Sequence, residues 1–374
     1  MTISFNRPTV TGKELDYIRQ ALDNGHVAGN GSFTRRCNDW LGATVGARRA
    51  FLTHSGTAAL EMAALLCGLG PGDEVVMPSF TFVSTANAVA LRGATPVFVD
   101  IRPDTLNIDE RLIEAAITKR TKAICVVHYA GVACEMDAVA AMVHRHGLRL
   151  IEDAAQALRS RYRGRPLGSF GDFAAVSFHE TKNFISGEGG ALLVNDASAV
   201  ARAEVIWEKG TDRGRFFRSE VEKYTWQDLG SSFLPSDMIA AFLWAQLEQA
   251  PSLSARRAAL WQRYHRGFEA LERRGAARRP IVPAECDHNS HLYYLLLPDR
   301  TVRDRLLDRL RDAGIQAPFH YVPLHSSPAG RTFGRVGGSL AVTDDVAGRL
   351  LRMPLWHDMT DEPDRVIETV YALL

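Results

Sequence analysis

The sequence has no excess charge of either sign, no long apolar run and few cysteines. Its 44 Lys and Arg residues against 43 Asp and Glu residues give a net charge of +1, so there is no basic field to hold nucleic acid or an anionic membrane. No apolar run approaches the ~18 residues that a bilayer span needs. The first ten residues lack the basic-then-apolar pattern of a secretory signal. We therefore expect no nucleic-acid partner and no membrane partner.

The cysteines favour a reducing, cytoplasmic location. They are odd in number, widely spaced and contain no C-x-x-C pair, which favours free thiols over a disulfide or zinc framework. His320 and His325 are separated by five positions across Pro323, and this spacing does not match a pair of metal ligands on a helix. We predict no metal site. The five cysteines are Cys37, Cys67, Cys125, Cys134 and Cys286.

The residues between about 50 and 195 alternate short apolar runs with helix-like stretches. Several of the apolar runs show no in–out alternation, as is typical of strands that are covered on both faces. Such alternation of strands and helices predicts a mainly parallel α/β sheet. The expected strands are 74–77, 96–99, 123–127, 148–151, 174–178 and 191–194, and the expected helices are 57–69, 83–91, 110–117 and 136–146.

The pattern changes after residue 194. Ser236 is expected to cap a helix that runs to residue 249, where Pro251 would break or kink it. A chain of 374 residues suggests two domains at about 150 residues each. We expect a large α/β domain over 1–250 and a small C-terminal α+β domain over 251–374. The later elements expected are a helix at 253–273, a strand at 292–297, a helix at 302–313, a strand at 315–320 and a helix near 344–351.

Four places on the expected sheet carry polar or aromatic residues just after a strand, where open parallel sheets bind ligands. The first is the segment 53–57, which precedes a strongly helical stretch. Gly56 would let the backbone approach a ligand closely, and the free N–H groups of a helix start form a phosphate site. An ordinary helix cap by Ser55 or Thr57 is the simpler alternative. The segment matches neither a dinucleotide-binding nor an ATP-binding glycine motif.

Two further places follow the strands at 148–151 and 74–77. Asp153 would lie over the sheet edge, either as an anionic partner for a cofactor nitrogen or as the cap of a following helix. Phe82 lies after the strand at 74–77, in the segment Pro78-Ser79-Phe80-Thr81-Phe82. An aromatic ring here would lie flat on a planar ligand or would fill the core.

The fourth place, and the most informative, is the loop around Lys182. It reads SFHETKN and is followed by GEGG, so a lysine lies in a polar, glycine-bounded loop between two apolar strands. Desolvation and nearby cations would lower the pKa of this lysine, as a Schiff-base lysine requires.

Together these segments resemble the nucleotide-sugar aminotransferases of the DegT/StrS type, which use pyridoxal 5′-phosphate (PLP). The resemblance runs in order along the chain through SGTAAL, GDEVVMPSFTFVSTANA, GATPVFVDI, VVHYAG, IEDAAQA, SFHETKN with GEGG, and HYVPLH. It implies the aspartate-aminotransferase type of PLP fold (fold type I), with a large, mostly parallel seven-stranded sheet and a small C-terminal domain. It also implies a homodimer with active sites at the subunit interface.

The resemblance assigns roles residue by residue. Lys182 is similar to the lysine that links covalently to the cofactor and later moves the proton. Asp153 is similar to the partner of the pyridinium nitrogen, which keeps the ring an electron sink. Phe82 resembles the residue that stacks on the ring, and Gln156 resembles the residue near the ring's 3′ oxygen.

The resemblance also implies a phosphate site and a departure from the family. Gly56, Thr57 and Ser177 would hold the phosphate. Many relatives carry an Asn in a G-Y-N-Y-R motif that reaches the partner subunit's phosphate, whereas Ser232 occupies that place here, within GSSFL. A serine can donate one hydrogen bond, but its reach is shorter.

The segment HYVPLH contains His320, Tyr321 and His325, which resemble residues near the substrate in the family. A structural turn around Pro323 is an equal alternative. The arginine that should meet the carboxylate of L-glutamate cannot be chosen from the sequence.

Within the family, four segments carry a closer resemblance: FTRRCNDWL, VVHYAGVACEMD, SFHETKNF and the stretch from EKGTDR to KYTWQDLGSSFLPSD. In these the sequence looks closest to the branch that aminates dTDP-4-oxo-6-deoxy-D-glucose at C4 with L-glutamate. The product of that branch, dTDP-4-amino-4,6-dideoxy-D-galactose, is a precursor of surface polysaccharides such as lipopolysaccharide or enterobacterial common antigen. Amination at C3 of a dTDP-oxo-sugar, or of a UDP-linked 4-oxo-sugar, is the alternative. A sugar dehydratase of the same fold resembles the chain with His in place of the lysine, so Lys182 argues against it. A non-catalytic binding protein of the same fold is a further alternative, which the intact Lys182 and Asp153 disfavour.

Overall fold

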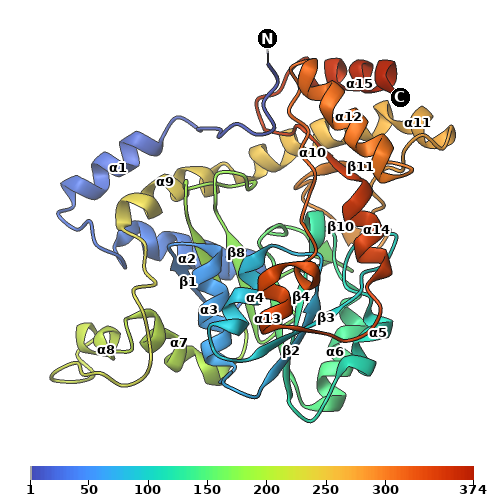
Figure 1. Ribbon diagram of the computed structural model, residues 1–374. Coiled ribbons are helices and arrows are strands. Elements are labelled where there is room, and N and C mark those ends of the chain that lie inside the picture. The colour runs from blue at the N-terminus through green and yellow to red at the C-terminus, as the bar shows by residue number, and fades with distance from the viewer. Residues whose placement is uncertain (1) are drawn as a thin grey trace.

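The computed structural model describes residues 2–374, and its centre is one large, mostly parallel sheet (Figure 1). Within those residues the sheet has eight strands in the order β1-β9-β8-β5-β4-β2-β3-β12. β9 runs antiparallel to β1 and β8, and the other neighbours pair in parallel. The strands are β1 (Arg49–Thr53), β2 (Glu74–Pro78), β3 (Thr95–Val99), β4 (Thr121–Val127), β5 (Arg149–Asp153), β8 (Phe173–Ser177), β9 (Gly190–Val194) and β12 (Arg335–Val336).

Helices cover both faces of this sheet because its strands are apolar on both sides. Along β2, Val76 belongs to one apolar core, whereas Val75 and Met77 belong to another, since successive side chains of a strand point to opposite faces. The first core includes α2 (Ser32–Val45), α5 (Glu110–Ala116), α6 (Met136–His146) and α9 (Asp237–Glu248), and the second includes α3 (Gly56–Leu66), α4 (Val83–Ala90) and α7 (Val200–Trp207).

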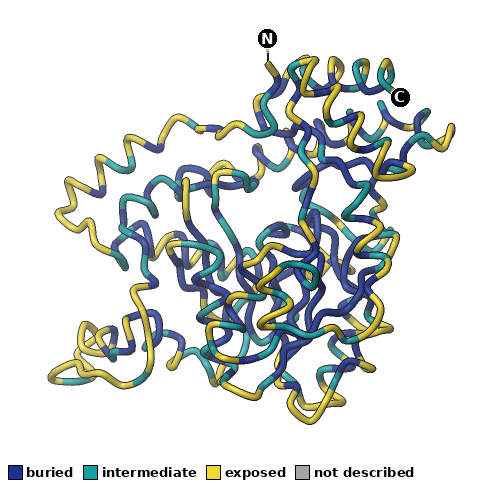
Figure 2. The backbone as a smooth tube through the Cα atoms, viewed as in Figure 1, coloured by how far each residue is buried: buried dark blue, intermediate teal, exposed yellow. Residues whose placement is uncertain are grey.

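Burial follows this layering. In Figure 2 the buried parts of the backbone concentrate along the central strands and the helices packed on them. The more exposed parts include α1 (Glu14–Asp23) and the segment around α8 (Arg213–Phe217), which projects from the body of the molecule. No helix within residues 2–374 is both long and apolar enough to cross a bilayer.

A third apolar core lies in the C-terminal part of the chain. Its centre is an antiparallel pair of strands, and Ile3 reaches it through a bridge to Ile315. The N-terminal segment therefore crosses to the C-terminal unit (Figure 1). A division of the chain after residue 250 stays a prediction. The elements of this part are α10 (Ala250–Gly267), α11 (Glu269–Arg273), β11 (Tyr293–Leu296), α12 (Arg300–Asp312), α14 (Ala341–Arg349), β13 (Leu350–Met353) and α15 (Glu362–Leu373).

The predicted α/β architecture is confirmed. The six strands and four helices expected between residues 57 and 194 are present, with ends that differ by at most three residues. Ser236 caps α9, since its Oγ accepts a hydrogen bond from the Ile239 amide at 3.4 Å. The sheet has one strand more than the expected seven, because the two-residue β12 adds an edge to β3.

Other details of the C-terminal prediction are wrong. Residues 315–320 do not form a strand, because Ile315 makes only an isolated bridge and Pro318 has no N–H to donate. The expected helix at 253–273 is divided into α10 and α11 at Phe268. The end of the helix expected near 344–351 is instead the start of β13, and the sequence reading missed β1 altogether.

Candidate active site

A cavity of about 610 Å³ lies where several strands of the sheet end. Val127, Asp153 and Ser177 are the last residues of β4, β5 and β8, and all three line it. This position and size are typical of a small-molecule site in an open α/β sheet. Of the predicted site residues, those that line the cavity are Gly56, Thr57, Phe82, Asp153, Gln156, Ser177, Lys182, His320 and Tyr321.

Lys182 lies in the loop that joins β8 to β9. The loop is closed at its base by the Phe178 amide, which donates to the Gly189 carbonyl at 2.8 Å. Burial lowers the pKa of Lys182 from its usual 10.5 to about 8; the negative charge of Asp153 opposes this shift, and the positive charge of Arg352 adds to it. A lowered pKa increases the fraction of neutral amine, which is the nucleophile that attacks a carbonyl.

Asp153 is buried at the end of β5, with part of its hydrogen-bonding capacity unused. Thr85 Oγ1 donates to Oδ2 at 2.7 Å, and the Ala155 amide donates to Oδ1 at 3.1 Å. A carboxylate offers about four acceptor positions. The residues after Asp153 form a turn and not a helix, so the helix-cap alternative is wrong. The remaining acceptor capacity is available to a donor in the cavity.

The start of α3 forms another part of the cavity wall. Ser55 caps this helix, since its Oγ accepts from the Ala58 amide at 3.0 Å, and Thr57 Oγ1 lies 2.7 Å from Ser84 Oγ. A Cβ atom added at Gly56 would lie 2.9 Å from the Ser177 Cβ. A glycine is therefore needed for the end of β8 to approach the helix start this closely. The first amides of a helix have no partner within the helix, so this end offers donors to an anion.

The two phenylalanines after β2 have different environments. Phe80 is 1% exposed and packs in the core against Tyr129, at a distance of 5.1 Å between ring centroids. Phe82 is 58% exposed and lines the cavity. The core alternative thus applies to Phe80, while the ring of Phe82 is available to a planar ligand.

Gln156 connects the sheet edge to the C-terminal part. Its Oε1 accepts from the Ala130 amide at 2.8 Å, and its Nε2 donates to the Tyr321 hydroxyl at 2.8 Å. The Tyr321 ring stacks on His320, at 3.6 Å between centroids, and the Tyr129 hydroxyl lies 2.6 Å from His320 Nδ1. Burial lowers the pKa of His320 well below its usual value, so its imidazole is neutral at pH 7.

Two predicted site residues lie outside the cavity lining. His325 Nδ1 lies 2.8 Å from Ser79 Oγ, and the His325 amide donates to the same oxygen at 3.1 Å. These contacts fix the 320s segment to the end of β2, which agrees with a structural role for His325 in the turn around Pro323. Ser232 is exposed and pairs with Glu208 in a single antiparallel bridge.

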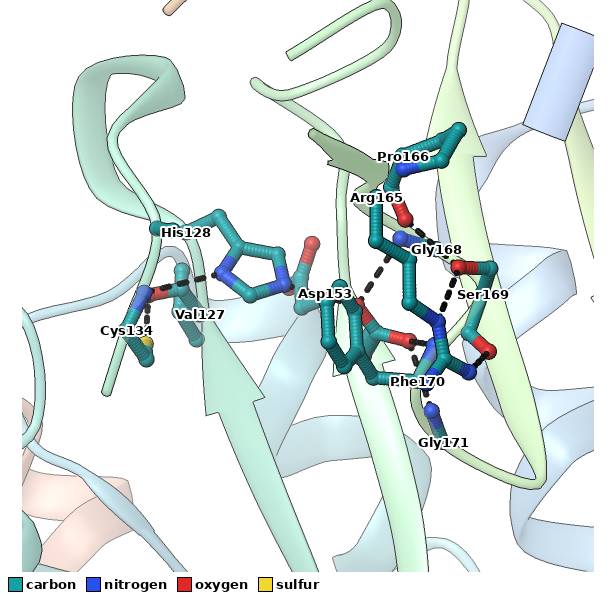
Figure 3. Close-up of polar contacts among 12 residues, drawn as sticks. Val127, His128, Cys134, Asp153, Arg165, Pro166, Gly168, Ser169, Phe170 and Gly171 are labelled. Atoms are coloured by element: carbon teal, nitrogen blue, oxygen red, sulfur yellow. Dashed lines mark hydrogen bonds and ion pairs between the residues drawn. The ribbon is translucent and has the colours of Figure 1, made fainter. Parts of the chain in front are cut away.

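The neighbour of Asp153 has a different environment. Glu152 and His128 form a fully buried pair, with His128 Nε2 2.9 Å from a carboxylate oxygen of Glu152. The backbone amides of Gly168, Phe170 and Gly171 also donate to Glu152. Figure 3 shows His128 and these loop residues gathered around the end of the strand. This network ties the loop after β7 (Arg165–Pro166) to the sheet.

The sequence reading missed Thr85 and the basic residues of the C-terminal part that line the cavity. Arg257 is buried, with Nε donating to the Ser290 carbonyl at 2.9 Å, and burial lowers its pKa to about 9. Arg352 and His291 also line the cavity. The only signal for Arg352 was its place inside the apolar run 350–356, since an arginine in such a run needs a polar partner.

Comparisons with known proteins agree with this geometry. The model of the DegT/DnrJ/EryC1/StrS aminotransferase family matches residues 8–371. The spore coat polysaccharide biosynthesis protein SpsC of Bacillus subtilis is 34% identical over 377 residues, which cover 98% of this chain and 96% of SpsC.

Solved structures give the same result. The aminotransferase TlmJ of Streptoalloteichus hindustanus is 32% identical with a TM-score of 0.90, covering 99% of this chain and 98% of TlmJ. The PLP form of Spr1654 of Streptococcus pneumoniae, a putative sugar aminotransferase by description, is 27% identical with a TM-score of 0.89, covering 100% of this chain and 98% of its own. With a family model that spans nearly all of its residues, this chain belongs to the DegT/DnrJ/EryC1/StrS aminotransferase family and is a PLP-dependent sugar aminotransferase.

Proposed function

We propose that the protein transfers the amino group of L-glutamate to C4 of dTDP-4-oxo-6-deoxy-D-glucose. The products are dTDP-4-amino-4,6-dideoxy-D-galactose, for surface polysaccharide synthesis, and 2-oxoglutarate. The observation that carries the amino-transfer chemistry is Lys182, whose pKa is lowered to about 8 in the same cavity as Asp153. The choice of sugar is supported by the resemblance of the motifs to the C4-aminating branch of the family.

The cavity residues fit PLP. The start of α3, with Gly56 and Thr57, and the neighbouring Ser177 offer donors for the phosphate, and Asp153 offers a carboxylate for the pyridinium nitrogen. Phe82 presents an exposed ring to the cavity. When bound, the cofactor supplies an aldehyde that condenses with amines and a ring that withdraws electrons from the adjacent carbon.

In this proposal Asp153 keeps the cofactor ring protonated, and Lys182 transfers protons between substrate and cofactor. The Asp153 carboxylate stabilises a proton on the ring nitrogen, and Thr85 fixes its orientation through the 2.7 Å hydrogen bond. Lys182 Nζ would move one proton in each half-reaction. In the first, the proton goes from the α-carbon of L-glutamate to the cofactor carbon that bears the amino nitrogen. In the second, it goes from that carbon to C4 of the sugar. Gln156 hydrogen-bonds near the 3′ oxygen of the ring, while His320 and Tyr321 contact the sugar substrate.

We also infer a homodimer with active sites at the subunit interface, in which Ser232 reaches the phosphate held by the partner subunit. Phe217 and Trp226, in and after α8, are 63% and 78% exposed, and large exposed apolar side chains favour an interface. A dimer mass in light scattering, and weaker PLP binding by Ser232→Ala, are the expected results. The five free cysteines support a cytoplasmic enzyme.

The test of the sugar is a set of parallel incubations with L-glutamate. The acceptors are dTDP-4-oxo-6-deoxy-D-glucose, its 3-oxo isomer and a UDP-linked 4-oxo-sugar, and the products are analysed by mass spectrometry and NMR. We expect the dTDP-4-oxo-sugar to react fastest, with one 2-oxoglutarate released per amine formed and the galacto configuration at C4. Faster amination of the 3-oxo or the UDP-linked acceptor would replace the proposed substrate with that acceptor.

A further inference from the structure

We propose that Arg352 binds a carboxylate of the amino donor. The inference rests on the proposed use of L-glutamate and assigns the substrate contact that the sequence could not. Arg352 lies on β13 of the C-terminal part, and its side chain lines the cavity that also contains Lys182.

The guanidinium of Arg352 has an aromatic ring against one of its faces and a hydrogen bond at one of its nitrogens. Its central carbon lies 4.5 Å from the centroid of the Phe5 ring, and Nη2 donates to the Phe319 carbonyl at 3.2 Å. The buried Nε has no hydrogen-bond partner among residues 2–374. These contacts fix the plane of the guanidinium and leave a donor unused.

The charge of Arg352 is also uncompensated. No acidic side chain within the described part of the chain lies in salt-bridge contact with it, whereas Arg335 forms a two-pronged ion pair with the nearly buried Glu74. Arg352 is half-buried, and a cation withdrawn from water without an acidic partner is costly, so such a group in a cavity favours an anionic ligand. A planar guanidinium matches a carboxylate with two parallel hydrogen bonds.

Arg352 is close enough to the reacting amine for its charge to act there. Burial and the charge of Arg352 together lower the pKa of His320, and Arg352 contributes to the lowered pKa of Lys182. An amino acid whose nitrogen takes the place of Lys182 Nζ carries its carboxylate one carbon away, within the field of this arginine. Arg257 is less suited to the role, because its Nε and Nη2 already donate to the carbonyls of Ser290 and His291.

The experiment measures the binding of glutarate, a dicarboxylate without an amine, to the PLP-loaded enzyme by calorimetry. Arg352→Gln should weaken glutarate binding about 10- to 100-fold, the value of a charged hydrogen-bonded contact. Arg352→Lys should recover part of the affinity, because it keeps the positive charge but cannot form two parallel hydrogen bonds with a carboxylate. Arg300→Gln is the matched control, since Arg300 is an exposed arginine of α12 that pairs with Asp304 in the next turn. The PLP content and thermal midpoint of each variant show that it is folded.

The two half-reactions separate this inference from the proposed function. With Arg352→Gln, the glutamate half-reaction should slow by a similar factor, while the half-reaction of the amine form with the dTDP-4-oxo-sugar should change less than about threefold. Unchanged glutarate binding would overturn the inference, as would a loss confined to the sugar half-reaction, which would point to the diphosphate. Failure of every sugar to react would overturn only the proposed function, because glutarate binding needs no sugar.

Discussion

The C-terminal end of β5 carries two adjacent carboxylates with opposite environments. Glu152 points to one face and Asp153 to the other, and both are buried. Glu152 receives four donors from the chain itself, at 2.6 to 2.9 Å. Asp153 receives two, and it lines the cavity. Burial alone therefore does not distinguish a structural carboxylate from a functional one, whereas the number of donors already supplied does.

The electrostatics follow the same division. Burial tends to raise the pKa of Glu152, but the hydrogen bond and charge of His128 and the loop amides outweigh it and hold the pKa below its usual 4.5. The acid on this face is thus kept ionised by its own chain. On the cavity face, Asp153 acts on Lys182 instead, and the spare acceptors face the ligand site.

The largest expected effect is on the cavity face. Lys182→Ala should lower turnover by at least 10²- to 10⁴-fold, the usual contribution of a positioned acid–base group. It should also abolish the absorbance of the lysine-linked cofactor. Lys122→Ala is the control, since Lys122 is exposed and its ion pair with Asp73 is 3.8 Å long. A Lys182→Ala enzyme with normal turnover and absorbance would contradict the whole assignment.

Asp153→Asn should come next in size. The amide keeps the shape of the side chain but removes the charge that favours a protonated ring nitrogen. We expect PLP binding to persist and turnover to fall about 10²- to 10³-fold, as for the loss of one preorganised electrostatic contact. Turnover per bound cofactor is the measurement, and a normal value would remove Asp153 from the mechanism.

Glu152→Gln should reduce stability and leave turnover unchanged, which is the opposite of the effect expected for Asp153→Asn. Its amide NH₂ would face backbone donors, so we expect the free energy of unfolding to fall by about 1–3 kcal/mol while turnover per folded, PLP-bound molecule stays near the wild-type value. The measurement is urea unfolding at several pH values. Because the folded pKa of Glu152 lies below 4.5, its contribution is present above that pH and is lost as the pH falls further. In Glu152→Gln, the free energy of unfolding should therefore decrease less as the pH falls below 4.5 than it does in the wild type. Loss of turnover without loss of stability would break the comparison.

The smallest effect is expected at Phe82. Since this ring is 58% exposed, Phe82→Ala should leave the free energy of unfolding nearly unchanged and weaken PLP binding only about 2- to 10-fold, as for one aromatic contact. Phe80→Ala is the matched comparison, and its loss from the core should cost about 3–5 kcal/mol of stability. Equal effects of the two changes on stability would contradict the distinction between them.

The sequence was sufficient for six strands of the sheet and for the cavity wall that they provide. Apolar runs predicted β2, β3, β4, β5, β8 and β9, and the rule that ligands lie beyond parallel strands placed Asp153, Ser177 and Lys182 at one cavity. The motifs alone could not distinguish Phe80 from Phe82, because both follow the same strand and their burial depends on neighbours distant in sequence.

The C-terminal contribution was harder to predict. His325 was grouped with His320 by proximity in sequence, but the turn after Tyr321 directs it to Ser79 instead. Arg352 carried a weak signal, because its place in the cavity lining depends on how β13 packs near residues that lie about 200 positions earlier in the chain. Such convergence depends on tertiary packing and not on local pattern.

The most direct test of the central claim is the pH dependence of covalent PLP capture by the cofactor-free enzyme. Only the neutral form of Lys182 attacks the aldehyde, so the second-order rate should rise with pH and level off around its pKa of about 8. Lys182→Ala should show no capture. A rate that keeps rising toward the ordinary lysine value of 10.5 would contradict the account, as would capture that survives the loss of Lys182.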